Sequence, residues 1–193
     1  MSYLRGFLPW IGFLVFSQVG WQWGALAAAV IAAATLVADR RAGTSWDGQI
    51  LAIGALAFFA ALTPVAFAAP HAALAAYCGA MADGWLAVVA WAGILLGAPF
   101  TLGIAKREAP EEVWDLPMFR NLNVVITSVW AGAFTVSAVA SVLLVDSSGM
   151  VRGIATAIAF IAPIVFTKRY VAAVQARHAD GGTAVDAEIA YAA

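Results

Sequence analysis

The chain has 193 residues, of which 64% are hydrophobic and 11% are charged, and its net charge is −1. Soluble domains carry about 45–50% apolar and about 25% charged residues, so this composition excludes a soluble globular fold and indicates a bilayer environment. The near-neutral charge leaves no basic surface for nucleic acid, and a single cysteine excludes a disulfide framework or a thiolate zinc site. We therefore expect the lipid bilayer as the main surroundings and no nucleic-acid partner.

Six apolar segments are separated by short polar stretches. Each predicts a membrane-spanning helix, because a backbone in lipid must satisfy its own hydrogen bonds. The expected fold is all-α, with about six transmembrane helices in a single domain over residues 1–178, followed by a disordered cytoplasmic tail over 179–193. The segments cover about 4–19, 21–38, 49–69, 72 or 84 to 105, 122–145 and 151–174. The first two are near the short limit for spanning.

The lysines and arginines predict the orientation of these segments, because loops on the cytoplasmic side of a membrane are enriched in them. Nine of the ten fall in the ends of the chain and in the second and fourth connections, and only Arg152 falls on the other side. Both termini are therefore expected in the cytoplasm. The expected location is the bacterial inner membrane, which the chain crosses several times.

The most charged part of the chain is the connection within residues 99–123, between the fourth and fifth apolar segments. It combines both charge signs with aromatic residues, so it is the stretch best suited to specific contacts. Its charged residues are Lys106, Arg107, Glu108, Glu111, Glu112, Asp115 and Arg120.

Within this connection, Pro110, Glu111 and Glu112 suit the first turn of a short helix, because proline fits the first helical position and carboxylates favour the positive end of the helix dipole. Trp114 supplies apolar bulk and Pro117 is expected to stop the turn. The pattern predicts a short amphipathic segment at the membrane surface. Glu111 and Glu112 also resemble a catalytic or metal-binding carboxylate pair, but adjacent helical residues point about 100° apart, which favours the structural interpretation.

The segment 122–145 carries one polar and aromatic face at alternating spacings of four and three residues. Such a face packs inward, either against other helices through hydrogen bonds or around a small ligand cavity. The residues are Asn123, Thr127, Trp130, Phe134, Ser137 and Ser141.

Asp83 is the charged residue nearest to a membrane interior. If the fourth helix begins at Ala72, Asp83 lies deep in the bilayer, where a carboxylate is costly and becomes a candidate for binding a proton or a cation. If the helix begins near Gly84, Asp83 is an N-cap at the outer surface. The following Gly84 and Trp85 favour the cap, since tryptophan is typical of the membrane interface.

The order of these features resembles a known family. The blocks are a first apolar helix at 7–16, an arginine pair at 40–41, a glycine–proline junction at 97–101, a proline–tryptophan loop at 110–114 and an asparagine-bearing helix start at 121–130. This layout is similar to the intracellular septation protein A family of bacterial inner-membrane proteins, or to a divergent sister family. The resemblance implies a multi-helix protein of cell-envelope growth or division that acts through partners. It marks Pro99, Trp114 and Asn123 as motif residues.

The expected function is therefore that of a non-enzymatic inner-membrane protein in envelope maintenance or septation, with membrane-protein partners or a second copy of itself. No metalloprotease, serine-hydrolase, nucleotide-binding or redox motif occurs, so we predict no catalytic, cofactor or metal residues. The alternative is a small solute or ion transporter or channel, which could be a substrate-binding membrane subunit, with the segment 122–145 lining the path. The residues that either function would use are Pro99, Arg107, Glu111, Glu112, Trp114, Asn123, Thr127 and Asp83.

Overall fold

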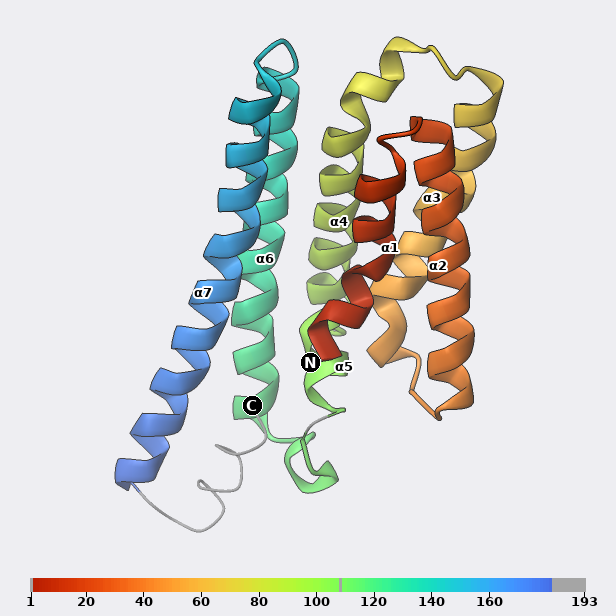
Figure 1. Cartoon of the computed structure of the whole chain (residues 1–193). Helices are drawn as coiled ribbons and strands as arrows, with labels where there is room; N and C mark the ends of the chain where they lie inside the picture. Colours follow the sequence, from red (N-terminus) through yellow and green to blue (C-terminus); the bar gives the residue numbers. More distant parts are fainter. Residues whose placement is uncertain (1, 108, 182–193) are drawn as a thin grey trace.

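A computed structural model describes residues 2–107 and 109–181, and it describes side chains for residues 5–107 and 109–176. These residues form helices and no β-strand (Figure 1). The α-helices are α1 (Ser2–Phe16), α2 (Trp21–Arg41), α3 (Ile50–Ala68), α4 (Cys78–Leu95), α5 (Phe100–Ala105), α6 (Pro117–Leu143) and α7 (Gly149–Gly181). Three short 3-10 helices connect them: η1 (Asp47–Gln49), η2 (Ala73–Tyr77) and η3 (Glu111–Val113).

Five helical stretches in the described part of the chain are long and apolar enough to cross a membrane. They are Trp21–Arg41, Asp47–Ala68, Ala73–Leu95, Pro117–Leu143 and Gly149–Ala176. The predicted all-α polytopic membrane fold is confirmed. The first apolar segment differs from the others, since its apolar helix Arg5–Phe16 is shorter than a full span.

The helices run up and down beside one another, with α4 between the pair α6–α7 and the group α1, α2 and α3 (Figure 1). The most extensive packing joins α4 to α6, α2 to α3 and α1 to α2. The α2–α3 and α4–α6 connections lie at the same end of the bundle, together with the start of α1 and the end of α7. The lysines and arginines of these segments therefore gather at one end of the molecule. We call it the basic end.

The short helix α1 joins the two groups of helices through aromatic side chains. Its Phe7 stacks on Trp130 of α6, with ring centroids 5.4 Å apart, and contacts the edge of Phe160 of α7. One turn later, Trp10 lies 4.8 Å from the ring of Phe59 on α3. Aromatic pairs of this kind add about 0.5–1.5 kcal/mol each beyond their buried area. These contacts make α1 part of the core although it is too short to span.

The segment predicted as the fourth helix forms two helices, α4 and α5. They are separate because the helical backbone conformation is interrupted at Gly97. Gly97 has a φ of 73°, a left-handed conformation that side chains disfavour. The Ala98 amide donates to the Gly93 carbonyl at 2.7 Å, and the Gly97 amide donates to the Ile94 carbonyl at 3.0 Å. These two bonds form a Schellman motif, which ends α4. Pro99, which cannot continue the preceding helix, is the N-cap of α5.

Two boundaries differ from the sequence prediction. The expectation that Pro117 stops a turn is wrong, because Pro117 is the first residue of α6, where proline needs no amide partner. The connection between α5 and α6 is therefore residues 106–116. At the other end of the chain, α7 continues to Gly181, so the first residues of the expected tail at 179 are helical. The rest of that tail, 182–193, lies outside the described residues.

Candidate functional site

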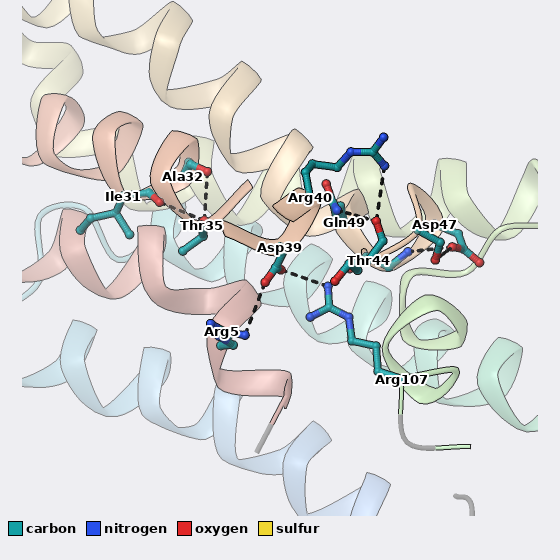
Figure 2. A network of polar contacts seen from close by, with 12 residues as sticks. Arg5, Ile31, Ala32, Thr35, Asp39, Arg40, Thr44, Asp47, Gln49 and Arg107 are labelled. Atoms are coloured by element: carbon teal, nitrogen blue, oxygen red, sulfur yellow. Dashed lines mark hydrogen bonds and ion pairs between the residues drawn. The ribbon is translucent and has the colours of Figure 1, made fainter. Parts of the chain in front are cut away.

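Asp39 is the centre of a network of charged residues at the basic end (Figure 2). It lies in the last turn of α2 and is 6% exposed. Arg5 of α1 approaches one carboxylate oxygen at 3.5 Å, and Arg107, which follows α5, approaches the other at 3.2 Å. Arg107 also donates a hydrogen bond to the Gly48 carbonyl. One buried carboxylate therefore ties α1, α2 and the 106–116 connection together.

A second ion pair joins the same connection to η1. The Lys106 ammonium lies 3.0 Å from a carboxylate oxygen of Asp47, and both side chains are partly buried. The other Asp47 oxygen accepts hydrogen bonds from the Gly48 amide, at 3.0 Å, and from the Ser45 hydroxyl. The two consecutive basic residues, Lys106 and Arg107, thus hold the start of the connection at two points.

The backbones of α5 and η1 touch directly beneath these ion pairs. A β-carbon added at Gly103 would overlap the Asp47 carbonyl group and would lie 2.6 Å from the Gly48 amide nitrogen. A β-carbon at Gly48 would lie 3.2 Å from the Gly103 carbonyl oxygen. At position 103 only glycine allows this approach, whereas a β-carbon at position 48 would be a tight contact.

The 106–116 connection has a small core of its own. Val113 is buried with Phe119 of α6 and with Ala105 and Ala109, and Trp114 packs against this cluster. The Trp114 indole N–H donates to the Ala109 carbonyl at 3.0 Å. The apolar side of the connection is thus turned toward α5 and the start of α6. Among its acidic side chains, those of Glu111, Glu112 and Asp115 are exposed. We call this connection the acidic platform.

Replacing Trp114 with alanine is expected to loosen the acidic platform and lower the free energy of unfolding by about 2 kcal/mol. The change removes a half-buried aromatic ring and its hydrogen bond to Ala109. Thermal unfolding in detergent measures the effect. The matched control is Glu112→Gln, which alters an exposed side chain and is expected to stay within about 0.5 kcal/mol. An equal loss of stability in both variants would contradict this assignment.

The polar face predicted on the segment 122–145 is buried in α6 and is used for packing at its start. Thr101 of α5 donates to the Asn123 carbonyl at 2.9 Å, and its hydroxyl oxygen lies 2.7 Å from that of Thr127. The Asn123 side chain donates to the Phe119 carbonyl at 2.9 Å. All three side chains are almost fully buried. These bonds fasten α5 to α6, which is the structural interpretation of the pattern.

Asp83 lies inside a helix, and the prediction that it caps a helix start near Gly84 is wrong. α4 begins five residues earlier, at Cys78, within the candidate span Ala73–Leu95. The Asp83 side chain is 9% exposed, and the Ser137 hydroxyl of α6 donates to its Oδ2 at 2.6 Å. A short helix η2 before Cys78 extends the apolar stretch outward, so the aspartate is placed deep in the span.

Two small pockets border these polar groups. One, of about 20 Å³, lies at the basic end and is lined by Arg5, Thr35, Asp39 and Arg107 among others. The second, of about 10 Å³, lies between α6 and α7. A single water molecule needs about 10–15 Å³ by this measure. Both pockets have the size of hydration sites. Within the described residues, no three side chains of histidine, cysteine, aspartate or glutamate are placed to hold a metal ion.

The structure thus assigns the predicted residues to separate places. Arg107, Glu111, Glu112 and Trp114 belong to the acidic platform, while Pro99, Asn123 and Thr127 belong to the α4–α5–α6 packing, and Asp83 stands apart. Sequence reasoning missed Asp39, whose neighbours Arg40 and Arg41 are typical of a solvated helix end. It also missed Thr101 and the pair Gly48–Gly103, for which only contacts across the bundle carry the signal.

These features define an all-α polytopic membrane protein with a charged network at one end and a carboxyl group inside the bundle. No family model, no curated protein and no solved structure matches the chain.

Proposed function

We propose that the chain is a non-enzymatic protein of the bacterial inner membrane that acts through partners in cell-envelope maintenance or septation, and that partners bind at the acidic platform. The observation that carries this proposal is the way the platform is built. Its start is held by the ion pairs of Lys106 and Arg107, and its apolar side chains are turned inward. A connection fixed in this way presents the exposed carboxylates of Glu111, Glu112 and Asp115 in a constant arrangement, which reduces the entropy that a partner must remove on binding.

The charge of the platform indicates what kind of partner fits. In the proposed orientation the basic end of the bundle faces the cytoplasm. Other membrane proteins carry their lysines and arginines next to the same membrane surface. Glu111, Glu112 and Asp115 are exposed there and would complement such a basic juxtamembrane segment. The resemblance to the septation family, in which Trp114 is one of the matched positions, supports the assignment to envelope processes.

Photocrosslinking in cells tests this proposal. A photoreactive residue at position 112 or 115 is expected to capture a membrane protein, and a second copy of this chain would appear as an adduct of twice the mass. The matched control is position 146, because Asp146 is an equally exposed carboxylate in the α6–α7 connection, at the opposite end. Equal capture at both ends, or none at positions 112 and 115, would contradict the proposal.

A second candidate is a small solute or ion transporter or channel, and the burial of Asp83 favours it. Ionisable residues inside membrane spans are rare, and they mark ion pathways and proton relays in many transporters. Here α6 would line the path, since its Ser137 contacts the aspartate. The residues at the start of α6 indicate helix packing and not a transport path, because Asn123 and Thr127 are buried against α5.

A further inference from the structure

Polar side chains of α6 and α7 form a row that leads from one end of the bundle to Asp83. We call this row, which consists of Ser137, Ser141, Arg152 and Thr156, the polar file. Ser137 of α6 takes part in two features. Its hydroxyl donates a hydrogen bond to Asp83 on α4, and its side chain lines the pocket between α6 and α7. The same pocket is lined by Ser141, one turn further along α6, and by Thr156 and Arg152 of α7. Arg152 and Thr156 are exposed. The pocket therefore extends from Ser137, which is hydrogen-bonded to Asp83, to the exposed side chains of Arg152 and Thr156.

The file opens at the end opposite the basic end. Ser137 lies six residues before the last residue of α6, or about 9 Å at the rise of an α-helix. Arg152 lies three residues into α7, within its first turn. A long arginine side chain at this depth can extend to the water boundary. Toward the other end, α6 turns the bulky side chains of Phe134 and Trp130 into the core, where both are nearly fully buried. The polar file ends at the aspartate.

We propose that Asp83 is a proton-binding site that exchanges its proton with the surface along the α6–α7 file. An ionised carboxylate inside a bilayer is costly unless it is paired or protonated. α3 and the packed part of α6 carry no cation near it, and Arg152 is the charged residue that lines the pocket. The titratable neighbour on α4 itself is Cys78, five residues before. Neutralisation by a proton is therefore the available solution.

The ligand is a proton because the site has too few oxygen atoms for a metal cation. The Asp83 carboxyl and the Ser137 hydroxyl supply three, whereas calcium takes six to eight and magnesium takes six. The balance of the step is simple. Asp83 Oδ2 accepts the Ser137 hydrogen bond, and Oδ1 takes a proton from a water molecule in the file to form the carboxylic acid. The hydroxide that remains combines with a hydronium ion at the surface to give two water molecules, so the net step adds one proton from bulk water to the carboxylate. This site does not depend on the proposed partner function.

Infrared spectroscopy of the purified full chain in lipid bilayers tests the site. At neutral pH the exposed carboxylates are ionised, so a carbonyl band of a protonated carboxylic acid reports a buried group. We expect this band in the unchanged protein and its loss in Asp83→Asn, which keeps the shape and the Ser137 contact. The thermal unfolding of both proteins establishes that the variant is folded. A band that persists in folded Asp83→Asn, or no band in the unchanged protein, would overturn the proposal.

The route is tested by the shift of the same band after transfer to heavy water. Ser141→Leu fills the file without touching the aspartate and is expected to slow the shift about tenfold, which equals about 1.4 kcal/mol in the barrier. The matched control is Ser128→Leu on the same helix, whose serine bonds its own helix at the Val124 carbonyl and does not line the pocket. Equal rates in both leucine variants would overturn the proposed route.

Discussion

The variant Gly103→Ala is expected to lose roughly 3 kcal/mol of unfolding free energy, although it adds a single methyl group. The new β-carbon would overlap the Asp47 carbonyl group and approach the Gly48 amide nitrogen. These are backbone atoms, which cannot rotate away as the tip of a side chain can. α5 would have to move off η1, and the ion pairs of Lys106 and Arg107 that follow α5 would be strained. Thermal unfolding in detergent measures the loss.

The matched control is Gly132→Ala in the middle of α6. A β-carbon there meets no atom within 4 Å outside its own helix. Alanine is favoured over glycine in a helix by about 0.5–1 kcal/mol, so this variant should be neutral or slightly stabilised. A similar response at both glycines would show that α5 and η1 are not packed backbone against backbone.

The variant Arg107→Ala is expected to lower the free energy of unfolding by about 3 kcal/mol. It removes one of the two cations of Asp39 and leaves this buried carboxylate with Arg5 alone. Removing one partner of a buried ion pair typically costs about 3–5 kcal/mol. The lower value applies here because Arg107 is 21% exposed. The acidic platform should also become sensitive to protease, since Arg107 fixes its start.

Arg5→Ala is the control, because it removes the other cation from the same carboxylate. The Arg5 side chain is 60% exposed, and exposed pairs contribute about 0–1 kcal/mol. In the background of Asp39→Asn, the cost of Arg107→Ala should shrink, which a double-mutant cycle measures. Equal costs for the two arginines, or additive costs for Asp39 and Arg107, would contradict the buried network.

Much of the fold could be predicted from the sequence, because apolar length alone locates most spans. The glycine–proline junction at 97–101 marked an interruption by Pro99, but the segment that ends at 105 was predicted as one span and not as the two helices α4 and α5. A continuous apolar run hides such a break, since the run stays apolar on both sides. The prediction that Asp83 caps a helix was wrong for a related reason. Asp-Gly-Trp is typical of a helix start, but the apolar residues before Cys78 continue the span outward.

The candidate site was predictable in part. The density of charges at 99–123 identified the connection that the structure fixes at the basic end. Asp39 could not be found, because burial of a charge depends on which helix is packed against it, and nothing local to α2 indicates Arg107, 68 residues away. The acidic platform, in contrast, could be predicted from its local sequence. Its pattern predicted an amphipathic segment, and its apolar side chains are packed against the chain's own α5 and α6.

The two proposals for this chain are compatible as long as the polar file ends at Asp83. A proton that enters and leaves at the same end changes the charge between α4 and α6 and crosses no membrane. A transporter would need a second path from Asp83 to the basic end, past Trp130 and the Asn123–Thr127 packing. The distinction between a partner-binding protein and a transporter is therefore a question about passage across the bilayer.

Ion flux in liposomes measures this passage directly. The purified full chain should show no proton, sodium or potassium flux above that of empty liposomes, because buried Trp130 and the Asn123–Thr127 packing separate Asp83 from the basic end. A clear flux that disappears in Asp83→Asn would contradict the partner-binding function and make the protein a transporter.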